Sequence, residues 1–406
     1  MRSSRAFLAQ SIATLYVAAA SQGVAIALAK LMTPAEFGRY VGVVTVATFL
    51  SLLQDAGLRT LIARENTAAT AGFAHAPDRL VAQATSHLAL STMVIAATFF
   101  VLPIAEREAL AAAVCALGAV LLVQLASTLL KAAGRFEYDA IWLVTTRTVS
   151  ACAVIGAAWL VGGSTLAVFL AWLLALLATF ALFPLGVRIR PRMMPSLATY
   201  RAAAGFLWID LATCIYHRID ILLIGLLRGS AAEIGWYAAA YRLLDGVLLL
   251  TTPFASLLFR RLRLLHFDEA RFAIVMKRSL MAAAAAGLMA AAGGWLFGAS
   301  VASFVYGEHY ASQTGSVLPW LFTALAFALP NLVLTQAAIA LGRLRLYAVA
   351  AALAAMVNIG LNVVLLPGFA IQGAAIATIV TEAVLALTLW TGLRPGRLRR
   401  PDEAAA

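Results

Sequence analysis

Apolar stretches of about 20 residues follow one another along the whole chain, and they constrain its fold more than any other feature of the sequence. A helix of about 20 residues crosses the hydrocarbon core of a bilayer, where only helices and closed barrels satisfy their own backbone groups. The short alternating segments that are typical of a barrel do not occur. Only 12% of the residues are charged, against about 25% in a soluble protein. We therefore predict an all-α, polytopic membrane protein.

The pattern predicts about twelve transmembrane helices in two sets of six. The expected spans are 7–31, 39–62, 80–103, 109–133, 141–162 and 164–185, then 203–227, 234–258, 279–304, 316–341, 346–366 and 370–393. These spans give an N-terminal six-helix lobe over residues 1–186 and a C-terminal lobe over 203–393. A basic cytoplasmic linker, 187–202, joins the lobes, and a cytoplasmic tail follows over 394–406.

The positive charge is concentrated in alternate connections between the predicted spans. Most of the 30 Lys and Arg residues fall on one side, and only Lys30, Arg39, Arg107 and Arg228 fall on the other. By the positive-inside rule, both termini are cytoplasmic and the protein lies in a bacterial inner membrane. Topology and contact with anionic lipid head groups account for the net charge of +12, so no nucleic acid partner is expected.

A short internal repeat relates the two halves. The segment Ala35-Glu-Phe-Gly-Arg-Tyr40 matches Ala232-Glu-Ile-Gly-Trp-Tyr237, and the same spacing places Arg64 on Arg261. Because each half holds an even number of spans, both halves enter the membrane in the same direction. The repeat therefore predicts a pseudo-two-fold axis along the membrane normal, as in secondary transporters whose lobes rock about a site near the midplane.

Ionisable residues inside the predicted spans are the candidates for a binding site, since each one costs free energy in the bilayer and should face a cavity or a partner helix. Arg218 and Arg242 are predicted at the same depth and are candidate ligands for an anionic head group, because guanidinium groups pair with phosphate oxygens. The carboxylates are candidate ligands for a coupling proton or Na⁺; they are Asp55, Asp245, Asp210, Asp220 and Glu382.

A purely structural interpretation of the same charges stays open. Arg242 and Asp245 are one helical turn apart and could neutralise each other. Arg218 could pair with Asp55 or Asp245 and hold the lobes together.

Enzymatic chemistry is not indicated. The predicted outer connections are short and carry no Ser/His/Asp constellation, and the sequence holds no P-loop. Cys115, Cys152 and Cys214 lie in apolar stretches without the spacing of a zinc site. We expect no catalytic residue, no metal and no cofactor, which disfavours a membrane glycan polymerase or ligase.

Several segments resemble a known family. They are Leu31-Met-Thr-Pro-Ala-Glu-Phe-Gly-Arg-Tyr40 with Asp55-Ala-Gly-Leu58, Ile219-Asp-Ile-Leu-Leu-Ile224, Phe304-Val-Tyr-Gly-Glu-His-Tyr310, and Asn358 to Thr378. Together they look like Wzx-type oligosaccharide flippases of the multidrug, oligosaccharidyl-lipid and polysaccharide exporter superfamily.

This resemblance implies two six-helix lobes that give alternating access to cytoplasm and periplasm. It implies a substrate as well, an undecaprenyl-diphosphate-linked oligosaccharide that is moved to the periplasmic leaflet for O-antigen and lipopolysaccharide, capsule or exopolysaccharide biosynthesis. Arg218 and Arg242 would then hold the diphosphate, and the polymerase and chain-length proteins of the pathway would be partners. The alternative within the superfamily is a cation-coupled multidrug exporter, which needs carboxylates in the N-terminal lobe, where Asp55 is available.

Overall fold

The computed structural model describes residues 2–70, 77–184 and 193–393, and every regular element in these ranges is an α-helix. The helices are α1 (Arg2–Leu31), α2 (Pro34–Asp55), α3 (Leu58–Thr70), α4 (Pro77–Val101), α5 (Arg107–Ala132), α6 (Phe136–Val161), α7 (Thr165–Leu182), α8 (Leu197–Arg228), α9 (Ala231–Leu264), α10 (Glu269–Tyr306), α11 (Glu308–Ala340) and α12 (Leu344–Gly392). The predicted all-α fold is confirmed. The predicted tail, 394–406, and the first part of the predicted linker lie outside the described residues.

Ten helices in the described ranges are long and apolar enough to cross a membrane, which makes the chain a multi-pass membrane protein. Helix α12 covers two of the predicted spans. Ala370 separates them with a non-helical backbone (φ 49°, ψ −140°), close to the break expected after residue 366. Helix α8 is not among the ten and carries Asp210, Arg218 and Asp220. That α8 spans the membrane stays a prediction.

The chain divides into two compact units, Met1–Cys214 and Ile215–Ala406, here called unit 1 and unit 2. The division falls inside α8, beyond the linker expected at 187–202. The first part of this helix therefore belongs to unit 1, and the second part belongs to unit 2.

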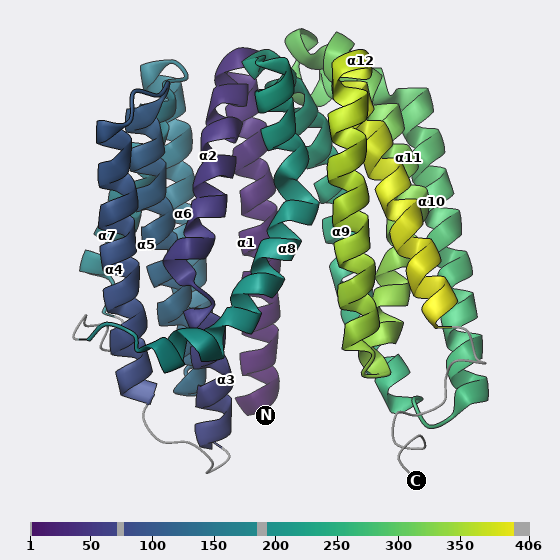
Figure 1. Ribbon diagram of the computed structural model, residues 1–406, viewed down its shortest axis with the longest axis horizontal. Coiled ribbons are helices and arrows are strands. Elements are labelled where there is room, and N and C mark those ends of the chain that lie inside the picture. Colours follow the sequence, from purple (N-terminus) through teal and green to yellow (C-terminus); the bar gives the residue numbers. More distant parts are fainter. Residues whose placement is uncertain (1, 71–76, 185–192, 394–406) are drawn as a thin grey trace. The chain divides into compact units, whose positions relative to one another are not determined.

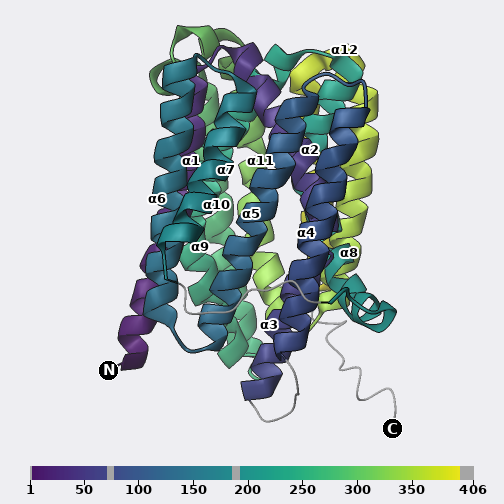
Figure 2. The same cartoon turned by 90° about the vertical axis from the view of Figure 1, so that its left-hand side faces the viewer.

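Unit 1 is built around α5, which packs against α2, α4, α6 and α7. These helices run side by side in Figures 1 and 2, and α3 lies at the same end of the unit as the start of α1. The central part of α5 is almost entirely buried, with Ala113 and Val114 fully shielded. Its many alanines let the neighbouring helices approach closely, as is usual where helices associate in a bilayer.

The span predicted over 39–62 corresponds to α2, which can cross the membrane, but its bounds are wrong because a second helix, α3, begins at Leu58. Helix α2 ends at Asp55, Ala56 takes the left-handed conformation (φ 49°), and Gly57 follows it (φ 72°). The joint is also crowded, since a Cβ atom on Gly57 would lie 2.5 Å from the carbonyl oxygen of Ala203 in α8. Asp55 and Gly57 interrupt the apolar run here, and α3 carries Arg59, Arg64 and Glu65, so the sequence did hold signals of the break.

Unit 2 is built around α11, which packs against α9, α10 and α12 and lies beside α10 in Figure 1. Glycines of α10 allow this close approach. A Cβ atom on Gly287 would lie 2.4 Å from the carbonyl oxygen of Leu325, and one on Gly294 would lie 2.5 Å from Cβ of Phe322. Small residues at such positions bring helix backbones together inside a membrane.

The internal repeat begins a capped helix in each unit. Thr33 caps α2 by accepting a hydrogen bond from the backbone of Glu36, whose carboxylate in turn accepts from the backbone of Thr33. Ser230 caps α9 by accepting from the backbone of Glu233. The two copies therefore start the second helix of their units with the same local chemistry.

Candidate functional site

The predicted site residues fall into two groups, one in each unit. Asp55 and Asp210 belong to unit 1. The members in unit 2 are Arg218, Asp220, Arg242, Asp245 and Glu382.

In unit 1, Asp55 lies at the joint between α2 and α3 and is paired with an arginine. Its side chain is 11% exposed, and Oδ1 lies 3.5 Å from Nε of Arg59, one turn further along the chain. Asp210 of α8 is half-buried and lies within electrostatic range of both residues. The unit 1 group is thus two carboxylates around one guanidinium group, so part of its negative charge is already neutralised.

The first part of α8 is fixed to unit 1 by polar contacts as well as by the joint at Gly57. The Tyr200 hydroxyl and Nδ1 of His87 lie 2.8 Å apart, and Nε2 of the same ring lies 2.9 Å from the carbonyl oxygen of Leu53. Thr199 donates to Oε1 of Gln83 at 3.2 Å. These contacts hold Asp210 on a helix that is anchored to α4 and α2.

In unit 2, Asp220 is buried and its carboxylate is satisfied by two donors. The Tyr237 hydroxyl donates to Oδ2, and the backbone of Ile221 donates to Oδ1 at 2.9 Å. Asp220 is 6% exposed and Tyr237 is fully buried. Tyr237 is the last residue of the repeat, so the repeated segment supplies a direct partner to a buried acid.

Glu382 of α12 is held by two other helices. The Tyr216 hydroxyl of α8 donates to Oε1, and Nδ2 of Asn331 in α11 donates to Oε2 at 2.7 Å. Asn331 also donates to the backbone carbonyl oxygen of Glu382 at 2.8 Å. A carboxylate placed within a predicted span is therefore satisfied by uncharged donors, which stabilise it inside the unit.

Arg242 and Asp245 form the ion pair that the one-turn spacing permits. Nη1 of Arg242 lies 3.4 Å from Oδ2 of Asp245, and the two side chains are 23% and 31% exposed. The structural interpretation of these two residues is thus supported by contact. Both side chains remain partly exposed.

Arg218 differs from Arg242, because among the described residues it forms no hydrogen bond and no ion pair. Its side chain is half-buried and lies within electrostatic range of Asp220 and Tyr241. Tyr241 also lies within range of Asp245 and Glu382, so it marks the place where the unit 2 charges converge. A guanidinium group with free donors beside a polar cluster can donate hydrogen bonds to the oxygens of an anionic ligand.

Sequence reasoning found the charged residues of unit 2 and missed their neutral partners. Tyr216, Tyr237, Tyr241 and Asn331 all lie in apolar stretches, where a tyrosine or an asparagine is easily read as packing. The position of Tyr237 at the end of the repeat was the one available signal. Among the residues that the structure describes, no three His, Cys, Asp or Glu side chains gather as a metal site requires.

The chain is similar to a known protein family and to known transporter structures. A model of the family described as "Polysaccharide biosynthesis protein" matches residues 27–314. Among solved structures, the lipid II flippase MurJ in an inward closed conformation is similar, with a TM-score of 0.74 and 12% identity over 95% of this chain and 87% of that one. No curated protein matches.

Two further structures share the architecture. An inward-facing multidrug resistance MATE family transporter of the MOP superfamily has a TM-score of 0.67 and 13% identity, over 97% of this chain and 96% of that one. A MOP superfamily transporter from Pyrococcus furiosus has a TM-score of 0.58 and 12% identity with the same coverage. At these identities the likeness shows the fold alone, which this chain shares with these three structures.

Proposed function

Because the chain belongs to the polysaccharide biosynthesis protein family, we propose that it is a flippase which moves an undecaprenyl-diphosphate-linked oligosaccharide from the cytoplasmic to the periplasmic leaflet of the inner membrane. The substrate would enter O-antigen, capsule or exopolysaccharide biosynthesis. The observation that carries the proposal is the family match, together with a transporter fold shared with a lipid II flippase. Flipping breaks no covalent bond, so the function requires no catalytic residue.

In this proposal Arg218 binds the diphosphate. Its donors are not used by any other described residue, and a planar guanidinium group suits the geometry of phosphate oxygens. Arg242 would join it when its 3.4 Å pair with Asp245 opens. The lipid tail would stay in the bilayer while the sugar head group crosses.

The test compares Arg218→Gln with Arg228→Gln in cells that carry each variant as the sole copy. Arg228 lies at the end of the same helix, where it donates two hydrogen bonds of 3.0 Å to Glu233. We expect Arg218→Gln to reduce export of the polysaccharide at least about tenfold, since a hydrogen bond to a charged group contributes about 1.5–3 kcal/mol. Arg228→Gln should export normally. Normal export by Arg218→Gln, at normal membrane abundance, would contradict the assignment.

We also propose that carboxylates within the predicted spans couple transport to a cation, either a proton or Na⁺. The candidates are Asp220, Asp245 and Glu382 in unit 2 and Asp55 and Asp210 in unit 1. Asp220 is preferred because it is buried and held by a tyrosine, so a change in its charge would disturb a defined contact. Asp220→Asn should abolish the response of flipping to collapse of the ion gradient. Asp268→Asn, at the exposed start of α10, should retain the response.

A multidrug exporter is less well supported. Such a transporter needs negative charge in the N-terminal lobe to attract cationic substrates, and the Asp55 carboxylate is paired with Arg59 at 3.5 Å. Deletion of the gene should leave resistance to cationic drugs unchanged. A glycan polymerase or ligase would instead let single lipid-linked units reach the periplasm and would leave them unpolymerised or unattached.

A further inference from the structure

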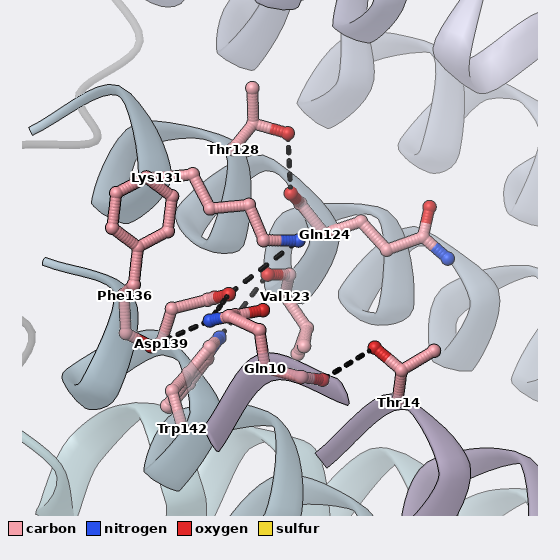
Figure 3. A network of polar contacts seen from close by, with 9 residues as sticks. All are labelled: Gln10, Thr14, Val123, Gln124, Thr128, Lys131, Phe136, Asp139 and Trp142. Carbon is pink, nitrogen blue, oxygen red and sulfur yellow. Dashed lines mark hydrogen bonds and ion pairs between the residues drawn. The ribbon is translucent and has the colours of Figure 1, made fainter. Parts of the chain in front are cut away.

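The most completely buried carboxylate of unit 1 lies away from the groups described above. Asp139 is on the first turn of α6, and its side chain is 0% exposed. Gln10 of α1 donates from Nε2 to Oδ2 of Asp139 at 2.8 Å, and Lys131 at the end of α5 places its Nζ 3.5 Å from the same oxygen. Figure 3 shows the three side chains pointing toward one another from three helices.

Gln10 contacts α6 twice. The same Nε2 atom donates to the backbone carbonyl oxygen of Phe136 at 2.6 Å. Two turns along, the hydroxyls of Tyr16 and Thr148 lie 2.7 Å apart. Between these contacts Ala13 is 1% exposed, whereas Leu8 and Ile12 on another face of α1 are 59% and 58% exposed. The N-terminal half of α1 is therefore joined to α6 by polar contacts as well as by packing at Ala13.

The C-terminal half of α1 is held differently. Val24, Ala25, Leu28 and Ala29 are all buried, with exposed fractions of 8% or less. Burial of apolar side chains is not broken by the loss of one hydrogen bond, whereas a polar attachment is. The C-terminal end of α1 is thus fixed by apolar packing, and the N-terminal end adds directional polar contacts with α6.

The hydrogen bonding of the Asp139 carboxylate is incomplete. Oδ1 of Asp139 has no hydrogen-bond partner among the described residues, and Lys131 is 45% exposed, so water screens its attraction. The unsatisfied oxygen of a buried carboxylate costs desolvation free energy, and this cost offsets part of the stabilisation from its other contacts.

We propose that Asp139 is a positioning residue which, with Gln10 and Lys131, forms a polar latch that holds the N-terminal half of α1 on α6 and opens during transport. The inference rests on the proposed flippase function for its consequence, but the latch itself is a property of unit 1. Asp139 touches no substrate in this account and acts through the position of α1.

The latch is tested with a single cysteine at Ala13, in a full-length protein whose Cys115, Cys152 and Cys214 are replaced by alanine. The rate of maleimide modification in native membranes reports exposure of the α1 surface that faces α6. Ala29→Cys is the matched control, because both alanines are 1% exposed and lie in the same helix. We expect Asp139→Ala to speed modification at position 13 at least about tenfold, the effect of losing about 1.4 kcal/mol. Modification at position 29 should be unchanged.

Equal protection of position 13 with and without Asp139 would overturn the latch. Equal acceleration at positions 13 and 29 would overturn it too, because it would indicate general loosening of the unit. A second variant separates charge from shape: Asp139→Asn retains an oxygen that accepts from Gln10 and loses the ion pair with Lys131, so it should fall between wild type and Asp139→Ala.

The same variants are then assayed for the sidedness of lipid-linked oligosaccharides. We expect Asp139→Ala to slow flipping at unchanged membrane abundance, and normal flipping would overturn the positioning role. The thiol measurement does not depend on the substrate, so a failure of the flippase proposal and a failure of the latch are distinguishable.

Discussion

The two copies of the repeat begin with the same capped turn and then serve different purposes. In unit 1, Tyr40 stacks on Phe37 and Phe169, with ring centroids 6.2 and 5.2 Å apart. In unit 2, the matching Tyr237 is fully buried and donates to Asp220. The position in unit 1 that corresponds to Asp220 is Gly23, which offers no carboxylate. The two segments therefore begin a helix in the same way, whereas the contact between the repeat's tyrosine and a buried carboxylate occurs in unit 2.

The positions that correspond to the unit 2 charges follow the same rule. Arg218 corresponds to Ser21, and Arg242 corresponds to Thr45. Ser21 and Thr45 donate to backbone carbonyl oxygens of their own helix. Unit 1 uses uncharged residues where unit 2 carries arginine, which favours unit 2 as the place where an anionic group is bound.

The largest expected fall in stability follows from loss of the aromatic contact in unit 1. Phe169 is fully buried between Tyr40 and Trp172. Phe169→Ala should lower the free energy of unfolding by about 3–5 kcal/mol, as for other buried aromatic truncations. Thermal unfolding of the detergent-solubilised protein measures this. Phe100→Ala is the control, since that ring is 64% exposed and should change stability little.

The joint at Gly57 is the next test, because α9 continues as a helix through the corresponding position, Phe254. Gly57→Ala should destabilise by about 2–4 kcal/mol, combining left-handed strain with overpacking against Ala203. Gly134→Ala is matched in backbone conformation (φ 70°) and has open space around its Cβ position. It should show the strain alone, about 1 kcal/mol, and an equal loss of stability at both glycines would refute the crowded joint.

Removal of the Tyr237 hydroxyl tests the contact that distinguishes unit 2 from unit 1. Tyr237→Phe should cost about 1–3 kcal/mol, because it takes one of two donors from a buried carboxylate. Combination with Asp220→Asn should cost less than the sum of the two single changes. Additive stabilities in the double-mutant cycle would mean that the contact contributes nothing of its own.

The smallest effect is expected at the surface. Arg39 and Glu106 lie 3.7 Å apart with 44% and 37% exposure, and exposed pairs contribute about 0–1 kcal/mol. Arg39→Gln should therefore leave the unfolding temperature nearly unchanged and should do so equally at high and low salt. A large fall in the unfolding temperature would show that the pair stabilises the protein more than its exposure predicts.

Hydrophobic periodicity was enough to predict the helices and the break near Ala370, because Pro367 and Gly368 interrupt the pattern there. It missed the break after Asp55, although Asp55, Gly57 and Arg59 interrupt the apolar run there. Asp139 was missed because an acidic residue in the first turn of a helix is ordinary. The repeat marked Tyr237 but not its contact with Asp220, and nothing marked Tyr216 as the partner of Glu382, since spacing along one helix does not determine what a second helix presents to it.

The most direct test of the central claim is the sidedness of lipid-linked sugar intermediates in a strain that lacks this protein. The intermediates are radiolabelled and then probed with a glycosidase or lectin that reaches only the periplasmic leaflet. The flippase account predicts that complete repeat units accumulate on the cytoplasmic side and that the wild-type gene restores their access to the probe. Single units that reach the periplasm but remain unpolymerised or unattached would contradict it.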